Sequence, residues 1–218
     1  GPTASRILRR IVEQLEGTET GVFKASLSFG VATKTQVQEE IYQIIQRAED
    51  RLYARKRAED KTLRNQHVAA MVSLLAGKDR ETELHSIRMQ SLALGMGGAL
   101  GFSIEALDDL SLLCALHDVG KVGIADEVLL KREELSPAEW EETKRHPEIG
   151  YRIVSASPDL AHIAKDILHH HEWWNGGGYP QGLKGEEIPL RARILAIVDA
   201  FDAMTHQRPY RTALSYQE

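Results

Sequence analysis

The stretch LSLLCALHDVGK at residues 110–121 joins an apolar helical pattern to a histidine–aspartate pair. Leu110, Cys114 and His117 lie on one helical stripe, so the stripe carries the imidazole toward the interior at the end of the helix. Neutral imidazole and carboxylate are both good ligands for metal ions, and the two oxygens of a carboxylate can bridge two ions. His117 and Asp118 are therefore candidate metal ligands, with a buried hydrogen bond between the two side chains as the alternative.

A histidine-rich segment follows at residues 169–180, which read HHHEWWNGGGYP. Successive side chains on a helix differ in direction by about 100°, so three histidines in a row cannot all face the core, but two adjacent ones can flank one metal centre. A solvated polyhistidine patch is the alternative. The glycines that follow allow the backbone to approach a ligand closely, and Tyr179 offers an aromatic face to a base.

Two carboxylates lie three residues apart in the otherwise apolar stretch RILAIVDAFDA at residues 193–203. Buried acids are costly unless they are paired or bind metal, so we expect Asp199 and Asp202 either to be paired or to bind metal. Arg208 and Arg211 follow in the sequence RPYR, where two guanidinium groups suit a phosphate or a guanine edge. The alternative is a pair of surface arginines beyond a helix end.

The composition excludes several classes of protein. The chain has 218 residues and a formal net charge of −5, so no global positive field favours a nucleic-acid polymer or an anionic membrane as its partner. Its single cysteine excludes an intrachain disulfide and fits a reducing compartment. The longest uncharged stretch, residues 89–104, is shorter than the roughly 20 residues that a membrane-spanning helix needs.

Hydrophobic periodicity predicts a mainly α-helical chain. Residues 21–33 alternate apolar and polar side chains like a half-buried strand, which gives the N-terminal part a small α+β character. Serine caps followed by an early acid predict helix starts after Ser103 and Ser136. The helical pattern covers residues 4–15, 36–76, 81–99, 103–117, 136–155, 158–171 and 189–205.

Four of these motifs together resemble one family. HDVGK, the HHE of HHHEWWNGGGYP, IPLRARILAIVDAFDAM and RPYR resemble, in order and approximate spacing, the HD-GYP subgroup of the HD-superfamily metal-dependent phosphohydrolases, over residues 63–218. The resemblance implies an HD-type helical bundle with two or three divalent metal ions, and a ligand set without thiolates favours iron or manganese. It also implies a cytoplasmic bacterial phosphodiesterase that hydrolyses cyclic di-GMP to pGpG, to GMP or to both.

The same resemblance implies roles for individual residues. Asp118 would bridge the ions at the catalytic centre, and Lys121 would stabilise charge on the phosphoryl oxygens, with Asp202 orienting Lys121. Tyr179, Arg208 and Arg211 would hold the guanine and the second phosphate, and Lys121 and Asp202 would complete the substrate-binding set. The implied metal ligands are Glu81, His85, His117, Asp118, His146, His170, His171 and Asp199, with Glu81 marking the subset that has a third ion. Asn175 stands where the family usually has an aspartate.

The N-terminal part resembles a second family. KASLSFGVAT at residues 24–33 and AEDRLYARKRAEDK at residues 48–61 are similar to the C-terminal part of a GGDEF diguanylate-cyclase domain. We therefore expect a truncated GGDEF-like fragment at residues 1–61 and an HD-GYP phosphohydrolase domain, lacking its last helices, at residues 62–218. The signature loop that binds GTP and metal precedes the matched region of that family, so no cyclase activity is expected.

Two other functions remain open from the sequence. A catalytically inactive receptor or scaffold would bind a cyclic dinucleotide without cleaving it, and such a protein would usually have lost some of the metal ligands. A hydrolase of another cyclic dinucleotide, such as 3',3'-cGAMP, would share the motifs. A homodimer and a GGDEF-domain protein are the macromolecular partners that the resemblance implies.

Overall fold

The structure is a computed structural model that describes residues 2–16, 27–78 and 82–206. The chain divides into two units, Gly1–Asn65 and Gln66–Glu218, each of which is described by itself. Glu81, Arg208 and Arg211 lie outside the described residues, and so does the first half of the expected strand. No helix in the described ranges is long and apolar enough to cross a membrane.

The first unit contains helix α1 (Pro2–Glu16), an extended segment at residues 27–33 and the first part of helix α2 (Ile41–Ala76). The predicted strand is not formed at residues 27–33, because no second strand pairs with them in the described part of this unit. Side chains of α2 supply hydrogen bonds instead. Arg47 donates to the carbonyl of Thr33 at 3.2 Å, and Arg51 donates to that of Val31 at 2.5 Å.

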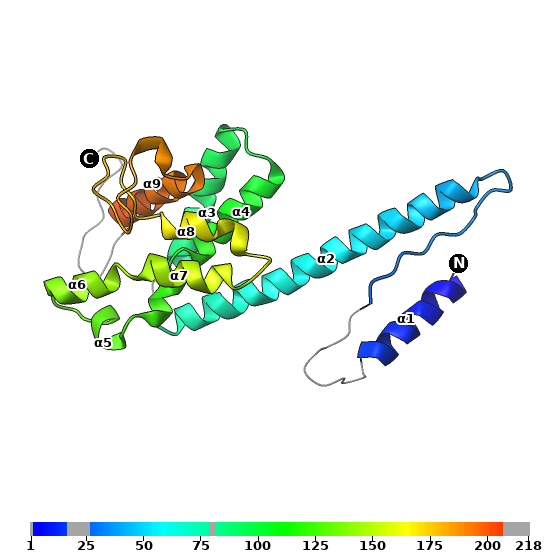
Figure 1. Cartoon of the computed structure of the whole chain (residues 1–218), viewed down its shortest axis with the longest axis horizontal. Coiled ribbons are helices and arrows are strands. Elements are labelled where there is room, and N and C mark those ends of the chain that lie inside the picture. Colours follow the sequence, from blue (N-terminus) through cyan, green and yellow to red (C-terminus); the bar gives the residue numbers. More distant parts are fainter. Residues whose placement is uncertain (1, 17–26, 79–81, 207–218) are drawn as a thin grey trace. The chain divides into compact units, whose positions relative to one another are not determined.

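Among the described residues of the second unit the regular elements are helices, joined by irregular loops (Figure 1). Ser103 caps α4 through the backbone N–H of Ala106, and Ser136 forms a capping box with Glu139 at the start of α6, so both predicted helix starts are confirmed. After the end of α2, the helices are α3 (Thr82–Ala99), α4 (Ile104–Leu116), α5 (Asp126–Leu129), α6 (Pro137–Thr143), α7 (His146–Ser155), α8 (Ala164–Leu168) and α9 (Leu190–Thr205). Three short 3-10 helices are η1 (Val119–Gly123), η2 (Ala161–Ile163) and η3 (Gly185–Glu187).

The core of the second unit joins the helices whose ends carry the candidate site residues. Helix α3 packs against α4 and α9, while α7 packs against η1 and α8. Fully buried side chains such as Met89, Leu113, Ile167 and Leu195 join these elements into one apolar cluster. Burial of each large aliphatic side chain contributes about 1.5–3 kcal/mol, so the cluster fixes where the helix ends lie.

Two predicted helices are shorter in the structure than in the sequence pattern. The helix expected at residues 136–155 is interrupted at Lys144 and Arg145, which separate α6 from α7. The helix expected at residues 158–171 is replaced by η2 and the short helix α8, which ends at Leu168. Both interruptions place histidines at helix ends rather than within helices.

Candidate metal centre

His117 and Asp118 lie where α4 ends. His117 is the C-terminal capping residue of α4, and Asp118 immediately precedes η1. The Nδ1–H of His117 donates to the carbonyl of Cys114 at 3.0 Å, so in the neutral ring Nε2 carries the lone pair. Gly120 is required nearby, because a Cβ there would lie 1.8 Å from the carbonyl oxygen of His146. The HD motif is thereby packed directly against the start of α7.

His146 owes its position to the break between α6 and α7. Pro147 has no N–H and its ring clashes with the carbonyl four residues earlier, so a continuous helix is disfavoured at this point. That carbonyl belongs to Thr143, and it accepts a hydrogen bond of 2.8 Å from Nδ1 of His146. The proline that ends the continuous pattern thus frees the oxygen that orients the imidazole.

The three successive histidines lie in the turn after α8. His170 donates from Nδ1 to the carbonyl of Ile167 at 2.5 Å and is almost completely buried. His171 lies beside it, with the two ring centroids 4.0 Å apart. His169 points elsewhere, because its Nε2 contacts Oε1 of Gln181 at 3.1 Å. His170 and His171 therefore enter the cluster, and His169 does not.

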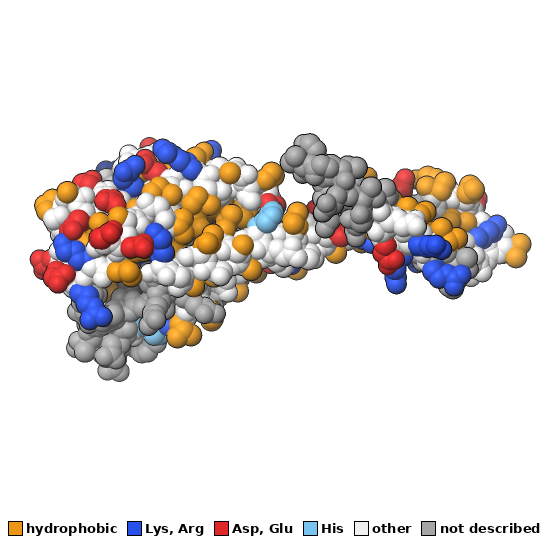
Figure 2. Space-filling model, turned by 90° about the horizontal axis from the view of Figure 1, so that it is seen from below, with side chains coloured by type: hydrophobic (Ala, Val, Ile, Leu, Met, Phe, Trp, Pro, Cys, Tyr) orange, Lys and Arg blue, Asp and Glu red, His pale blue; other side chains and the backbone are white. Residues whose placement is uncertain are grey.

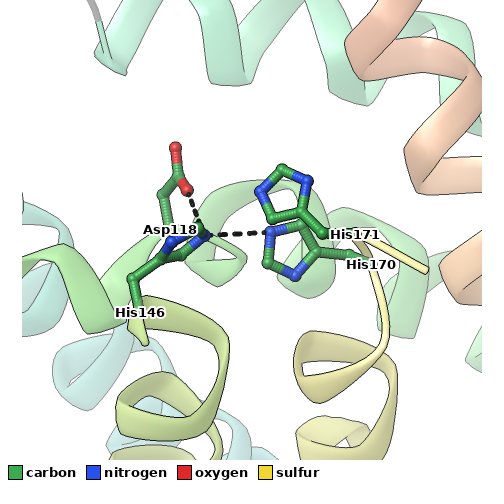
Figure 3. A group of neighbouring side chains, drawn as sticks. All are labelled: Asp118, His146, His170 and His171. Atoms are coloured by element: carbon green, nitrogen blue, oxygen red, sulfur yellow. Dashed lines mark hydrogen bonds and ion pairs between the residues drawn. The ribbon is translucent and has the colours of Figure 1, made fainter. Parts of the chain in front are cut away.

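The cluster contains four residues whose ligand atoms all lie within 4.8 Å of one another, and Figure 3 shows them converging: Asp118, His146, His170 and His171. The Nε2 atoms of His146 and His170 are 3.3 Å apart. Because both rings donate from Nδ1, these two Nε2 atoms are acceptors that face each other. Two lone pairs in this arrangement are suited to sharing a cation.

The carboxylate of Asp118 links this cluster to a second group of ligand atoms. Its Oδ1 lies 3.3 Å from Nε2 of His146, while its Oδ2 lies 3.3 Å from Nε2 of His117. The ring of His117 is in turn 5.8 Å from that of His85, whose Nε2 lies 3.4 Å from Oδ1 of Asp199. Asp118 therefore presents one oxygen to each group.

Asp202 differs from its expected role. The sequence analysis expected it to orient Lys121 and contact substrate, but its carboxylate is 1% exposed and accepts from Nδ1 of His85 at 2.6 Å and from Nε of Arg88 at 2.6 Å. Nδ1 of His206 lies 3.0 Å away. Because these groups surround it, Asp202 positions His85. Lys121 instead contacts Oδ2 of Asp118 at 2.8 Å.

Burial sets the protonation state of three histidines. Burial, reinforced by the neighbouring imidazoles, holds the pKa of His170 well below its ordinary value. Burial also lowers the pKa of His146 and lowers that of His171 to about 4. Neutral imidazole is the form that binds a metal ion.

For His117 and Asp118, neighbouring charges outweigh burial in setting the pKa. Burial alone would raise the pKa of Asp118, but the nearby Lys121 and His117 outweigh it and hold this pKa well below its ordinary value. Burial alone would lower the pKa of His117, but Asp118 and Asp199 outweigh it and raise this pKa. A cation between His117 and Asp118 would repel the imidazolium proton, so the ionised carboxylate would remain and His117 would bind as the neutral ring.

Comparison with known protein families identifies the family of this chain. The sequence profile of the HD domain matches residues 39–218. The chain belongs to the HD domain family. The match covers α3, α4, α7, α8 and α9, and so every described residue of the cluster.

Curated relatives of this HD domain are bacterial phosphodiesterases. A cyclic di-GMP phosphodiesterase of Thermotoga maritima is 42% identical over 143 residues, which cover 65% of this chain and 39% of that protein. The cyclic di-GMP phosphodiesterase response regulator RpfG of Xanthomonas campestris pv. campestris is 43% identical over 138 residues, covering 62% of this chain and 36% of that protein. The 3'3'-cGAMP-specific phosphodiesterase 2 of Vibrio cholerae is 36% identical over 143 residues, covering 65% and 27%. The chain thus spans less than two-fifths of the length of these relatives.

The loop of the HD domain that follows the histidines is held by Glu172, whose role the sequence analysis missed. The carboxylate is 3% exposed and accepts backbone N–H groups from Gln181 at 2.7 Å, Gly182 at 3.1 Å and Leu183 at 3.0 Å. A buried acid directly before a glycine-rich turn was the available signal, because such an acid needs donors and a turn has unpaired ones.

Tyr179 and Asn175 lie within the same loop. The Tyr179 ring stacks on His171, with centroids 4.9 Å apart, so one of its neighbours belongs to the cluster. Asn175 accepts from the backbone N–H of Gly177 at 2.9 Å, a turn that an aspartate could also make. The departure from the family pattern at Asn175 therefore preserves the local backbone geometry.

The sequence analysis left four histidines without a role, and all four have contacts that belong to the scaffold. His67 pairs with Asp159 at 3.3 Å, and His162 pairs with Asp109 at 2.8 Å. His169 and His206 contact Gln181 and Asp202, as described above. Among the described residues, the metal assignments from the sequence analysis fall into the two groups that Asp118 connects.

The donor set fits divalent metal ions. It combines imidazole nitrogens with carboxylate oxygens and includes no thiolate, because the single cysteine is buried behind His117 and burial raises the pKa of its thiol to about 12. Each Nδ1 of His85, His117, His146 and His170 has a hydrogen-bond partner, as is usual for histidines that bind metal through Nε2.

Proposed function

We propose that this chain is a metal-dependent phosphodiesterase that hydrolyses cyclic di-GMP to pGpG, to GMP or to both. The observation that carries the proposal is the carboxylate of Asp118, which directs its two oxygens at His146 and His117 in two adjoining ligand groups. Two adjoining divalent ions are a common arrangement for phosphoryl transfer. The names of the relatives in Thermotoga maritima and Xanthomonas campestris support cyclic di-GMP as the substrate.

The ligand groups divide the metal-binding roles. Asp118 would contribute to both, with His146, His170 and His171 completing the first group and His117, His85 and Asp199 the second. When bound, the ions supply the Lewis acidity that polarises a phosphoryl oxygen. Iron or manganese fits the mixed nitrogen and oxygen donors. Glu81 would add a ligand for a third ion, and it lies outside the described residues.

The residues around the cluster would bind and orient the substrate. Lys121 is 21% exposed and its ammonium lies beside Asp118, so it can offer positive charge to a phosphoryl oxygen at the same place. Tyr179 borders the cluster through His171 and would contact the nucleotide. Arg208 and Arg211 would hold the guanine and the second phosphate, although both lie outside the described residues.

A second cyclic dinucleotide is a specific alternative. The relative in Vibrio cholerae named a 3'3'-cGAMP-specific phosphodiesterase is 36% identical over 143 residues. Because cyclic di-GMP and 3',3'-cGAMP differ in one base only, the metal cluster treats their phosphates alike. The choice between them depends on contacts to the bases.

We also propose that the chain is a two-part signalling protein, with a GGDEF-like remnant at residues 1–61 and the phosphohydrolase domain at residues 62–218. The similarity of residues 24–33 and 48–61 to a GGDEF domain supports the first part. A homodimer or a GGDEF-domain protein would be its macromolecular partner. Size-exclusion chromatography with light scattering, with and without a purified GGDEF domain, tests this assignment.

The decisive experiment is hydrolysis of cyclic di-GMP by protein loaded anaerobically with Mn²⁺ or Fe²⁺. Chromatography should resolve pGpG and GMP from the substrate. His117→Ala and Asp118→Ala should abolish turnover, because each removes a ligand from the HD pair. Near wild-type rates in either metal-loaded variant would contradict the site assignment, and binding of cyclic di-GMP without turnover in the wild type would favour the receptor hypothesis.

Elemental analysis tests the number of ions. We expect a stoichiometry above two in the wild type and a loss of one ion in Glu81→Ala. A stoichiometry of two that Glu81→Ala leaves unchanged would contradict the third ion. The count does not depend on activity, so it separates metal binding from catalysis.

A further inference from the structure

Lys144 lies between the metal cluster and an exposed aromatic ring. It caps the end of α6, two residues before His146. Its Nζ is 5.8 Å from the centroid of the Trp140 ring and 5.9 Å from that of Tyr179. Since Tyr179 stacks on His171, a single ring separates Lys144 from a residue of the cluster.

The ammonium of Lys144 is held weakly by its present contacts. Both ring distances are near the outer limit of about 6 Å for a cation–π contact. Its ion-pair partner is Glu141, with Nζ and Oε1 2.7 Å apart, and the Glu141 side chain is 69% exposed. Exposed ion pairs contribute little to stability, so a ligand that offers a better acceptor can replace Glu141.

Trp140 presents an open aromatic surface at the same place. Trp140 is 44% exposed, and its helix α6 ends three residues before His146. Base stacking on aromatic rings is favourable for every base and does not discriminate among them. A donor at the edge of the stacked base supplies the discrimination.

Guanine is the base that this donor recognises. Guanine presents two acceptors, O6 and N7, on one edge, whereas adenine presents a donor amino group at the position of O6. An ammonium has donors only, so it pairs with guanine and is repelled by the adenine amino group. At the end of the second unit where Figure 1 draws α5 and α6, the face drawn in Figure 2 has acidic and basic side chains close together, so its described part shows mixed charge rather than a purely positive patch.

We propose that Trp140 and Lys144 form a base-binding subsite that selects guanine, with the base stacked on Trp140 and Lys144 donating to O6 and N7. This inference rests on the proposed function, because it assumes that the cluster binds a cyclic dinucleotide. The junction between α6 and α7 would then determine base specificity. Lys144 would recognise the base, and His146, two residues later, would bind metal.

Equilibrium binding tests the subsite without depending on turnover. Isothermal titration calorimetry would use slowly cleaved phosphorothioate analogues of cyclic di-GMP and of cyclic di-AMP with the metal-loaded full chain. Lys144→Met should weaken binding of the cyclic di-GMP analogue about tenfold and change binding of the cyclic di-AMP analogue less than about twofold. Lys144→Arg should retain the preference for guanine, while Trp140→Ala should weaken both analogues about tenfold.

Lys165→Met is the matched control, because Lys165 is an exposed lysine of α8 and its loss changes the net charge by the same amount. We expect it to leave both affinities unchanged. Equal weakening of the two analogues in Lys144→Met would show a phosphate contact and overturn the proposal, and so would no weakening of either. If the wild type binds cyclic di-GMP without cleaving it, only the proposed hydrolysis fails; if it binds neither analogue, the subsite fails as well.

Discussion

Glu172→Gln isolates the contribution of one buried carboxylate to the loop beside the cluster. Oε1 accepts from Gln181 and Gly182, and Oε2 accepts from Leu183. An amide group retains one oxygen and places an N–H donor where the second oxygen was, so at least one hydrogen bond is lost and two donors face each other. A hydrogen bond to a charged group contributes about 1.5–3 kcal/mol, so the free energy of unfolding should fall by at least that amount.

Thermal unfolding followed by circular dichroism measures this effect. For a chain of this size, the loss corresponds to a decrease in Tm of roughly 3–12 °C. Glu187→Gln is the control, because Glu187 accepts one backbone N–H from Lys184 at 2.9 Å in the same loop but is exposed. Its free energy of unfolding should change by about 0.5 kcal/mol or less. A Glu172→Gln protein that melts together with the wild type would refute the view that this carboxylate holds the loop.

Three further variants test the scaffold of the site. Gly120→Ala should lower the free energy of unfolding in urea by at least about 1–3 kcal/mol, because the new Cβ would lie 1.8 Å from the carbonyl oxygen of His146; unchanged stability would contradict this packing. Asp202→Asn should weaken metal binding about 10–100-fold in a metal titration, because it removes the carboxylate that orients His85; unchanged affinity would assign Asp202 to another role. Hydrogen bonds from Lys131 and Ser136 lower the pKa of Glu139 from 4.5 to about 2, so its stabilisation is full above pH 4.5 and is lost as the pH falls toward 2. The difference in free energy of unfolding between the wild type and Glu139→Gln should shrink over that pH range. A constant difference would show that ionised Glu139 does not stabilise the fold.

The candidate ligand pairs could be identified in the sequence because their chemistry is local. His117 and Asp118 are adjacent, and so are His170 and His171, so each pair reaches the same place wherever the chain carries it. His146 required the resemblance, because a single histidine in the sequence RHPEIG has no spacing signal of its own. The convergence of Asp118, His146, His170 and His171 on one place required the structure.

The errors came from interactions between distant segments. Periodicity predicted one helix across residues 136–155, although Pro147, which disfavours a continuous helix through Lys144 and Arg145, was visible within the pattern. Asp202 was assigned to Lys121, whereas the packing of α3 against α9 brings His85 and Arg88 to it. No local pattern in the sequence records which of two helices will face a given carboxylate.

The way in which three histidines of the candidate metal centre are oriented affects how the site tolerates mutation. His117, His146 and His170 are each held by the carbonyl oxygen of the residue three positions earlier. Every amino acid has that oxygen, so no substitution at those three earlier positions can delete the acceptor. A mutational scan would therefore find the ligands themselves intolerant and would find only packing limits at the positions that orient them. The orientation of these histidines depends on where the helices end. It does not depend on which amino acids supply the orienting carbonyl oxygens.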